Sequence, residues 1–303
     1  MARSRKPRGF PVNGMLLLDK PADISSNHAL QHAKRLLCAR KAGHTGSLDP
    51  IATGLLPICF GDATKISGLF LDADKSYWVR IRLGEETETG DCEGEVTVKR
   101  PVNLETRDIE KALEDFRGTF DQVPPMYSAL KRNGQPLYKL ARQGIEVERP
   151  PREVTVYSLS LVKHEANEIE LELSCSRGFY VRSLAIDLGN ALGCGGHVLE
   201  LRRTGVGQFS VDNAITLPQL ELVTSSKERE KLLLPIDESL SHFPKVRIPD
   251  NIALYFCRGQ TVRIPQTIQS GMVRVYSDSS KFLGLAEAGE DRKVSPKRLF
   301  QSQ

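Results

Sequence analysis

The chain has 303 residues, of which 40% are hydrophobic and 26% are charged, and this composition argues against extended disorder. The 42 basic and 38 acidic residues give a net charge of +4, which permits an anionic partner without requiring one. The apolar run at 15–18 is too short for a signal peptide, and nothing approaches the roughly 20 apolar residues of a membrane span, so we expect a cytoplasmic protein.

The length exceeds what one hydrophobic core usually needs, so we expect two domains. In chain order, the hydrophobic patterns and turn residues predict a strand at 14–19, a helix from Ser25 or Ser26 to about Cys38, a loop at 42–54, a strand at 55–60, a helix from Asp62 to Leu71, strands at 77–83 and 95–99 on either side of an acidic turn at 85–94, a helix from Thr106 to Gly118, strands at 154–164 and 168–176, a helix at 180–192, and paired strands at 197–204 and 206–211. Together these elements predict an α+β or mixed α/β domain over 10–240.

The pattern changes after a largely helical connection at 216–242. Short strands with Gly and Pro turns follow at 260–264, 271–277, 281–287 and 293–300. We therefore expect a small β-rich domain over 245–303.

Two parts of the chain are locally basic. The first ten residues carry Arg3, Arg5, Lys6 and Arg8 without an acid. The segment 124–152 contains turn residues at Pro124-Pro125, Asn133-Gly134, Pro136 and Gly144, together with Lys131, Arg132, Lys139, Arg142, Arg149 and Arg152. Its pattern predicts a protruding hairpin and a short helix. Each cluster is compatible with a solvated face or with an anionic partner.

The loop at 42–54 combines several glycines with Asp49-Pro50. The glycines allow tight turns, and the proline stiffens the chain directly after the carboxylate. From the spacing alone, an ordinary turn explains the same residues, and the Gly-Lys-Ser/Thr ending of a phosphate loop is missing. A metal site is a rival interpretation, because His28 and His32 share one face of a predicted helix, with His44 or Asp49 to complete the site. The glutamate of H-E-x-x-H is absent, and none of the six cysteines forms a C-x-x-C pair.

The extended sequence around this loop resembles the signature of the TruB family of tRNA pseudouridine synthases. The matching segments are GHTGSLDPIATGLLP at 43–57, CFGDATK at 59–65, LDKP at 18–21 with Ser25-Ser26, KSY at 75–77, GFYVR at 178–182, GCGGHV at 193–198 and LRR at 201–203. They follow the family's order from about residue 10 to 215. The tail resembles, more weakly, the PUA-like RNA-binding domain of bacterial members.

The resemblance implies a fold and an activity. The family converts a uridine in the T arm of tRNA (position 55) into pseudouridine by breaking the bond from ribose C1′ to N1, rotating the uracil and joining C1′ to C5. It uses no metal or organic cofactor. A catalytic domain with a mixed, mainly antiparallel sheet flanked by helices is implied, with 124–152 as a thumb-like insertion. We expect a monomer without an obligate protein partner.

Four matched residues imply a catalytic centre. Asp49 matches the essential aspartate and is the expected nucleophile, and Arg182 is the cation expected to keep it ionised. Tyr77 is expected to stack on the uracil and to transfer a proton, and Tyr180 to hold the Asp49–Arg182 pair by hydrogen bonding. Attack at C1′, attack at C6 and deprotonation at C2′ to a glycal stay open as routes, of which we favour the glycal.

Five further residues are expected to bind RNA. His44 matches the residue that takes the space vacated by the flipped base, and flipping itself costs a few kcal/mol. Leu201 is expected to line the uracil pocket, and Lys20 to support either the loop or a phosphate. Arg142 and Arg152 are candidate phosphate contacts. A non-catalytic RNA-binding or RNA-folding module is the alternative function.

Overall fold

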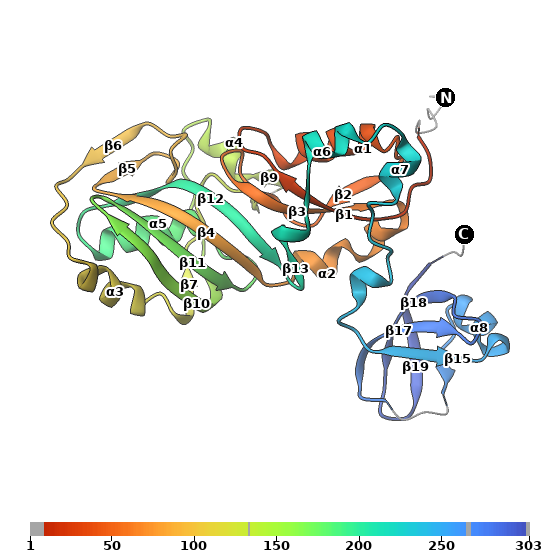
Figure 1. Cartoon of the computed structure of the whole chain (residues 1–303). Coiled ribbons are helices and arrows are strands. Elements are labelled where there is room, and N and C mark those ends of the chain that lie inside the picture. The colour runs from red at the N-terminus through yellow and green to blue at the C-terminus, as the bar shows by residue number, and fades with distance from the viewer. Residues whose placement is uncertain (1–8, 133, 265–267, 301–303) are drawn as a thin grey trace.

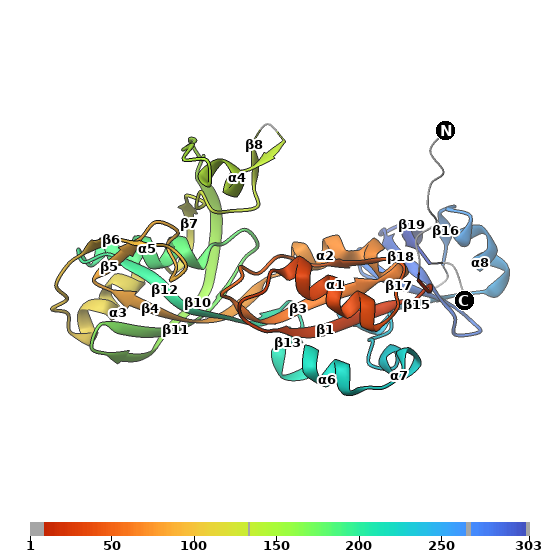
Figure 2. The ribbon, with the colours of Figure 1, turned by 90° about the horizontal axis from the view of Figure 1, so that it is seen from above.

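The computed structural model describes residues 9–132, 134–264 and 268–300; the basic residues at 3–8 and the expected turn residue Asn133 lie outside these ranges. The chain forms an elongated body, with a smaller sheet at one end (Figure 1) and a projecting segment above its middle (Figure 2). None of the helices in the described ranges is long and apolar enough to cross a membrane.

The body is organised by a ten-stranded mixed sheet that is mainly antiparallel, as predicted. In spatial order its main path contains β14 (Ile215–Thr216), β1 (Gly14–Lys20), β3 (Thr53–Phe60), β12 (Gly196–Val206), β4 (Lys75–Leu83), β11 (Glu168–Cys175), β10 (Arg152–Glu165) and β7 (Gly118–Gln122). β2 (Ala42–His44) pairs with β3, and β13 (Phe209–Ser210) pairs with β12. The pairs β1–β14 and β3–β12 are parallel. Strand β12 therefore joins the N-terminal strands to the rest of the sheet.

Helices and short turns surround this sheet. They are α1 (Ser26–Leu36), η1 (Gly61–Ile66), α2 (Ser67–Leu71), α3 (Thr106–Glu114), α5 (Val181–Ala191), η2 (Val211–Asn213), α6 (Leu217–Leu222), α7 (Ser226–Glu230) and η3 (Glu238–Leu240). Helix α1 begins as predicted, because the Ser25 side chain accepts a hydrogen bond from the His28 backbone N–H at 3.1 Å. Helix α5 packs on β12 and carries the second part of the expected catalytic centre.

The C-terminal residues form a five-stranded sheet around a cluster of their own. The sheet contains β15 (Lys245–Ile248), β17 (Gly271–Ser277), β18 (Phe282–Ala288), β19 (Lys293–Leu299) and β16 (Val262–Arg263), and it is accompanied by α8 (Asp250–Cys257). A further apolar cluster joins Leu285 and Phe300 of this part to Leu17 and Leu55 of the large sheet. The division of the chain into domains at about 240–245 stays a prediction.

Segment 124–152 contains the expected hairpin and short helix, as β8 (Lys131–Arg132), β9 (Gln135–Pro136) and α4 (Leu137–Ala141). It projects from the body above the large sheet (Figure 2). The acidic turn is more ordered than predicted, since β5 (Glu85–Thr87) pairs with β6 (Val96–Lys99).

Some elements differ from the sequence-based expectation. The loop expected at 42–54 begins with strand β2, and the helix expected at 62–71 is a 3-10 turn followed by a short α-helix. Strands β7 and β15 and helix α8 were not predicted. β7 is an edge strand whose residues are mostly exposed, so its sequence lacks the alternation of apolar and polar residues that would predict a strand. Its pairing with β10 stabilises it instead.

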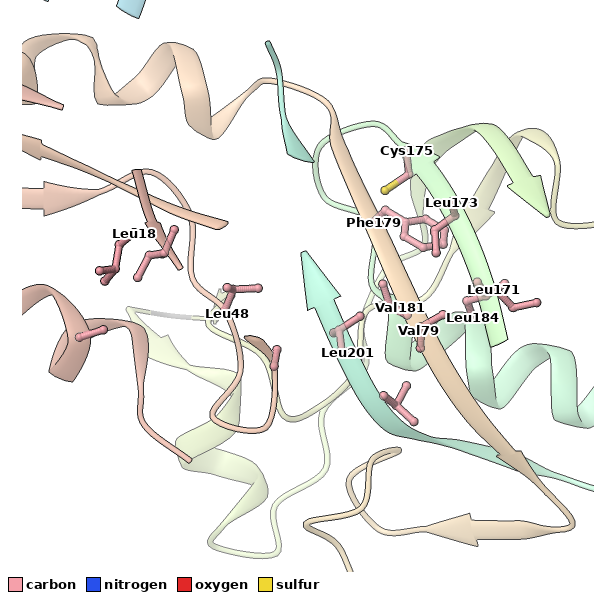
Figure 3. Close-up of a cluster of buried hydrophobic side chains, with 14 of the residues drawn as sticks. Leu18, Leu48, Val79, Leu171, Leu173, Cys175, Phe179, Val181, Leu184 and Leu201 are labelled. Atoms are coloured by element: carbon pink, nitrogen blue, oxygen red, sulfur yellow. The ribbon is translucent and has the colours of Figure 1, made fainter. Parts of the chain in front are cut away.

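The hydrophobic core extends beneath the expected catalytic loop. Leu48 of that loop and Leu201 of β12 belong to the same cluster as Leu18, Val79 and Leu184 (Figure 3). The residue directly before Asp49 is therefore anchored in the core, and this anchoring limits the movement of the carboxylate.

The contact between α5 and β12 requires a glycine at position 189. A Cβ there would collide with the backbone of Gly195 and Gly196. We expect Gly189→Ala to lower the free energy of unfolding by about 1–3 kcal/mol through overpacking. Gly68→Ala is the control: its Cβ would meet open space in α2, so the variant should be neutral or slightly more stable. Chemical denaturation measures both, and equal losses would contradict the prediction.

Candidate active site

The loop that carries Asp49 spans residues 45–52 between β2 and β3 and is fixed through its backbone. The Ser26 hydroxyl donates to the Leu48 carbonyl at 2.9 Å and accepts from the Leu48 N–H at 2.7 Å. The Ala52 N–H donates to the Asp49 carbonyl at 3.1 Å, which closes a turn around Pro50. These bonds hold the carboxylate on a rigid turn.

Lys20 supports this turn from below. Its side chain is fully buried, and its ammonium donates to the carbonyls of Pro21 at 2.8 Å, Ile24 at 2.7 Å and Pro50 at 3.1 Å. Burial lowers the pKa of Lys20 to about 8, against the raising effect of the Asp49 charge. Of the two roles expected for Lys20, loop support fits. The phosphate contact is wrong, because the side chain has no accessible surface.

Arg182, in the first turn of α5, provides the cation next to Asp49. The distance from Arg182 Nη2 to Asp49 Oδ2 is 2.9 Å, and only 5% of the arginine side chain is exposed. The guanidinium also donates to the carbonyls of Thr89 at 3.1 Å and Tyr127 at 2.6 Å. The expected pairing of Asp49 with Arg182 is present.

A second carboxylate, Asp91, faces the same guanidinium. Its Oδ2 lies 3.5 Å from Arg182 Nε, and its side chain is almost completely buried. Asp91 was missed because it is one of several acids in the turn at 85–94, and no local signal separates it from the others. The long-range contact with α5 distinguishes it, and that contact is visible only in the fold.

The protonation of Asp49 reflects two opposing influences. Its side chain is 41% exposed, but it lines the cavity, where neighbouring protein atoms displace much of the water around the carboxylate. This burial raises the pKa of Asp49 above its ordinary value, the Arg182 charge lowers it, and the Asp91 charge raises it again. A carboxylate with a raised pKa is a stronger base than an exposed aspartate.

Tyr77 lies on β4 and faces the same cavity as Asp49. Burial raises the pKa of the Tyr77 phenol, and the charge of the neighbouring Arg203 guanidinium opposes that rise. The net direction is upward, so the phenol keeps its proton at neutral pH and is able to donate it.

Tyr180 is the residue that precedes α5. Its backbone N–H donates to Gln122 Oε1 at 2.8 Å, and its carbonyl accepts from Gln122 Nε2 at 3.1 Å. Its ring lines the cavity together with Ser128. These hydrogen bonds fix the start of α5 through the backbone, and the hydrogen-bonding role expected for the Tyr180 hydroxyl stays a prediction.

The cavity has a volume of about 390 Å³ and mixes charged, aromatic and apolar walls. Its lining comprises residues 46–49, Leu71, Lys75, Tyr77, Ser128, Ala129, Ser176, residues 178–182, Leu201 and Arg203. Leu201 is 7% exposed and forms an apolar part of this lining, and its expected contact with a uracil stays a prediction. His44 stands outside this lining at the end of β2, half-buried; burial lowers its pKa, so the imidazole is neutral at pH 7.

Arg142 and Arg152 lie in the projecting segment and do not line this cavity. Arg142 is exposed at the end of α4 and stacks over Tyr138, with 5.7 Å from its guanidinium carbon to the ring centre. Arg152 lines a separate cavity of about 440 Å³ with Lys131, Arg132 and Arg149. The basic residues of the segment therefore form a group that is separate from the Asp49 cavity.

The described residues do not form the metal site that was considered for His28 and His32. Across residues 9–132, 134–264 and 268–300, no group of three or more His, Cys, Asp or Glu side chains could hold a metal ion. His32 Nε2 instead lies 2.8 Å from Glu221.

Comparisons with known proteins agree over the whole chain. Residues 34–181 match the model of the TruB family pseudouridylate synthase N-terminal domain, residues 182–241 that of the tRNA pseudouridylate synthase B C-terminal domain, and residues 244–300 that of the pseudouridine synthase II TruB C-terminal domain. The chain is 50% identical over 306 residues to tRNA pseudouridine synthase B of Nitrosococcus oceani, covering 100% of this chain and 99% of the relative. It is 48% identical over 309 residues to the protein of that name from Coxiella burnetii RSA 493, covering 100% of both.

Solved structures show a similar fold. A Cbf5–Nop10–Gar1 complex contains a chain that superposes with a TM-score of 0.74 at 25% identity, covering 99% of this chain and 92% of that one. An H/ACA ribonucleoprotein bound to a substrate RNA containing 2′-deoxyuridine gives a TM-score of 0.73 at 23% identity, with 99% and 92% covered.

The raised pKa of Asp49 predicts a pH-dependent cost to stability. In the unfolded chain Asp49 ionises at about 3.8, but in the folded state it ionises only at higher pH. Its contribution to stability is therefore complete below 3.8 and is lost as pH rises through the folded-state pKa. We expect Asp49→Asn to unfold at a higher temperature than the parent at pH 7 and to lose this advantage near pH 4. Thermal melts across this range test the sign; a less stable variant at pH 7 would contradict it.

Proposed function

The chain belongs to the TruB family of pseudouridylate synthases, a family of enzymes that form pseudouridine in tRNA, and from this membership we propose that it isomerises uridine 55 in the T arm. The observation that carries the proposal is the Asp49–Arg182 ion pair, whose atoms Oδ2 and Nη2 lie 2.9 Å apart in the lining of the cavity. We also propose that the enzyme acts as a monomer in the cytoplasm, where tRNA is processed.

Asp49 supports cleavage of the glycosidic bond. Its raised pKa makes the carboxylate a competent base, and the Arg182 guanidinium stabilises the ionised form that must act. Both properties favour the glycal route, in which Asp49 removes the C2′ proton while the bond from C1′ to N1 breaks. The uracil leaves with the bonding pair, rotates and bonds to C1′ through C5. The C2′ proton is returned as the new bond forms. The C5 proton is then lost while N1 takes up a proton, so the product has the same atoms as the uridine.

Tyr77 and Leu201 support recognition of the flipped uracil. Their side chains line the same cavity as Asp49, one aromatic and one apolar, so a pyrimidine ring has a stacking surface and a hydrophobic wall. The Tyr77 phenol keeps its proton and is placed to exchange it with the ribose or the base. Tyr180 contributes a further aromatic wall to this cavity.

The neutral imidazole of His44 is a candidate for the space that the flipped base leaves. Neutrality matters, because a neutral ring enters a base stack at a smaller desolvation cost than a charged one.

Segment 124–152 is the proposed thumb that holds the T loop. Arg142 and Arg152 are exposed on it, and the arginines and lysine of its own cavity make it suited to a phosphate backbone. Its base is tied to the catalytic helix, since Ser183 Oγ donates to the Val123 carbonyl at 2.9 Å and Arg182 donates to that of Tyr127. The β-rich part at 245–303 is proposed as a second RNA-binding domain of the PUA-like type.

Release of tritium from a T-arm stem-loop labelled at C5 of uridine tests the activity directly. We expect Asp49→Asn to lower the single-turnover rate at least ~10⁴-fold, because the group that begins the reaction is lost. Its binding to the stem-loop should stay close to that of the parent. Asp115→Asn, an exposed aspartate after α3, is the matched control and should keep full activity. Full activity of Asp49→Asn would refute the assignment and favour a non-catalytic RNA-binding role.

The thumb proposal predicts a change in the salt dependence of binding. Each phosphate contact releases counterions, so Arg142→Ala and Arg152→Ala should each reduce the slope of log affinity against log salt by about 1. Arg107→Ala on α3, a residue that is 78% exposed and paired with Glu105, should leave the slope unchanged. Filter binding at several salt concentrations measures the slopes. Unchanged slopes for both thumb variants would show that this segment does not bind the backbone.

A further inference from the structure

Arg203 lies at the centre of the strands that build the cavity. It belongs to β12, and the strand register places it opposite Gly54 of β3 on one side and Tyr77 of β4 on the other. Only 1% of Arg203 is exposed, which makes it one of the largest fully buried side chains of the described chain. A cation at such a position needs a specific set of partners, because burying a charge is costly.

The guanidinium binds the catalytic loop through its backbone. Nε donates to the Leu55 carbonyl at 2.7 Å, Nη2 to that of Gly46 at 3.2 Å and Nη1 to that of Ser47 at 3.4 Å. All three nitrogen atoms thus bind the chain on either side of Asp49.

The backbone of Arg203 also contacts β3, the strand that directly follows the loop. A Cβ at position 54 would collide with the Arg203 backbone, and Gly54 adopts φ +99°, which only glycine tolerates easily. Strand β12 and the start of β3 therefore approach so closely that no side chain fits at position 54.

The same side chain lies beside Tyr77. The two residues are register partners on β12 and β4, and both line the cavity. The Arg203 charge opposes the effect of burial on the pKa of the Tyr77 phenol. Arg203 therefore binds the Asp49 loop directly and also lies next to Tyr77 in the cavity lining.

We propose that Arg203 is a positioning residue of the reaction, which fixes the distance and orientation of the Asp49 loop relative to the Tyr77 hydroxyl. This inference rests on the proposed function, in which both residues act on one uridine. It does not place Arg203 on the substrate: the guanidinium acts through the two groups it holds. A lysine keeps the charge but has a single ammonium in place of the planar fork, so it cannot hold all these partners in one geometry.

Arg203→Lys tests the proposal in the full-length enzyme. We expect the single-turnover rate of tritium release to fall about 100-fold, as it does when reacting groups are misplaced by about 1 Å. The dissociation constant of the stem-loop should stay close to that of the parent.

Arg229→Lys is the matched control, because Arg229 also donates to three carbonyls, those of Leu220, Leu36 and Glu221, away from the cavity. It should lose comparable thermal stability and keep its rate. Equal rate losses in the two variants, or loss of RNA binding in Arg203→Lys, would overturn the proposal.

A double-mutant cycle separates positioning from a general structural effect. If Arg203 positions the loop against Tyr77, Tyr77→Phe removes part of what Arg203 provides. The combined rate loss of Tyr77→Phe with Arg203→Lys should then be smaller than the product of the single losses, whereas independent effects multiply. If the two rate losses multiply, the positioning role of Arg203 is refuted, but the function proposed for Tyr77 is not. An active Tyr77→Phe enzyme would instead refute the function proposed for Tyr77.

Discussion

The cavity depends on the contacts that surround the buried guanidinium of Arg182. Taking an ion out of water costs several kcal/mol unless partners replace the lost solvent. Arg182 receives Asp49 and Asp91 as carboxylates and the carbonyls of Thr89 and Tyr127 as further acceptors. These partners come from the catalytic loop, the acidic turn and the base of the thumb. One side chain thus requires three separate segments to be in place together, and the cavity exists only when they are.

Asp49 shows how such a centre balances stability against reactivity. The loop is rigid because Leu48 is anchored in the core and Lys20 binds the Pro50 carbonyl. This rigidity keeps the carboxylate low in the cavity, where burial raises its pKa, and Arg182 limits that rise. The group is basic enough to remove a proton and still able to ionise. A more exposed aspartate would be easier to accommodate but would be a weaker base.

Sequence patterns predicted the helices and strands that are determined by residues close together in the chain. The Ser25 cap and the strands at 77–83, 154–164 and 168–176 follow from capping and hydrophobic patterning. The extended motif identified Asp49 and Arg182 as partners, although more than a hundred residues separate them. Asp91, Arg203 and strand β7 were missed for the opposite reason. An acid among acids, an arginine within a strand and an exposed edge strand acquire their roles only from distant contacts.

The carbonyls that hold Arg182 have a consequence for how this sequence is free to vary. Thr89 and Tyr127 bind the guanidinium through main-chain oxygens, which every amino acid possesses. For these two contacts, the side chains at positions 89 and 127 can be exchanged, but the number of residues in the segments that lead to these positions cannot change. Inserting or deleting a single residue between β7 and Tyr127 shifts the carbonyl away from Arg182. The length of the chain between β7 and Tyr127 is therefore constrained by the active site. The amino-acid types at these positions do not reveal that constraint.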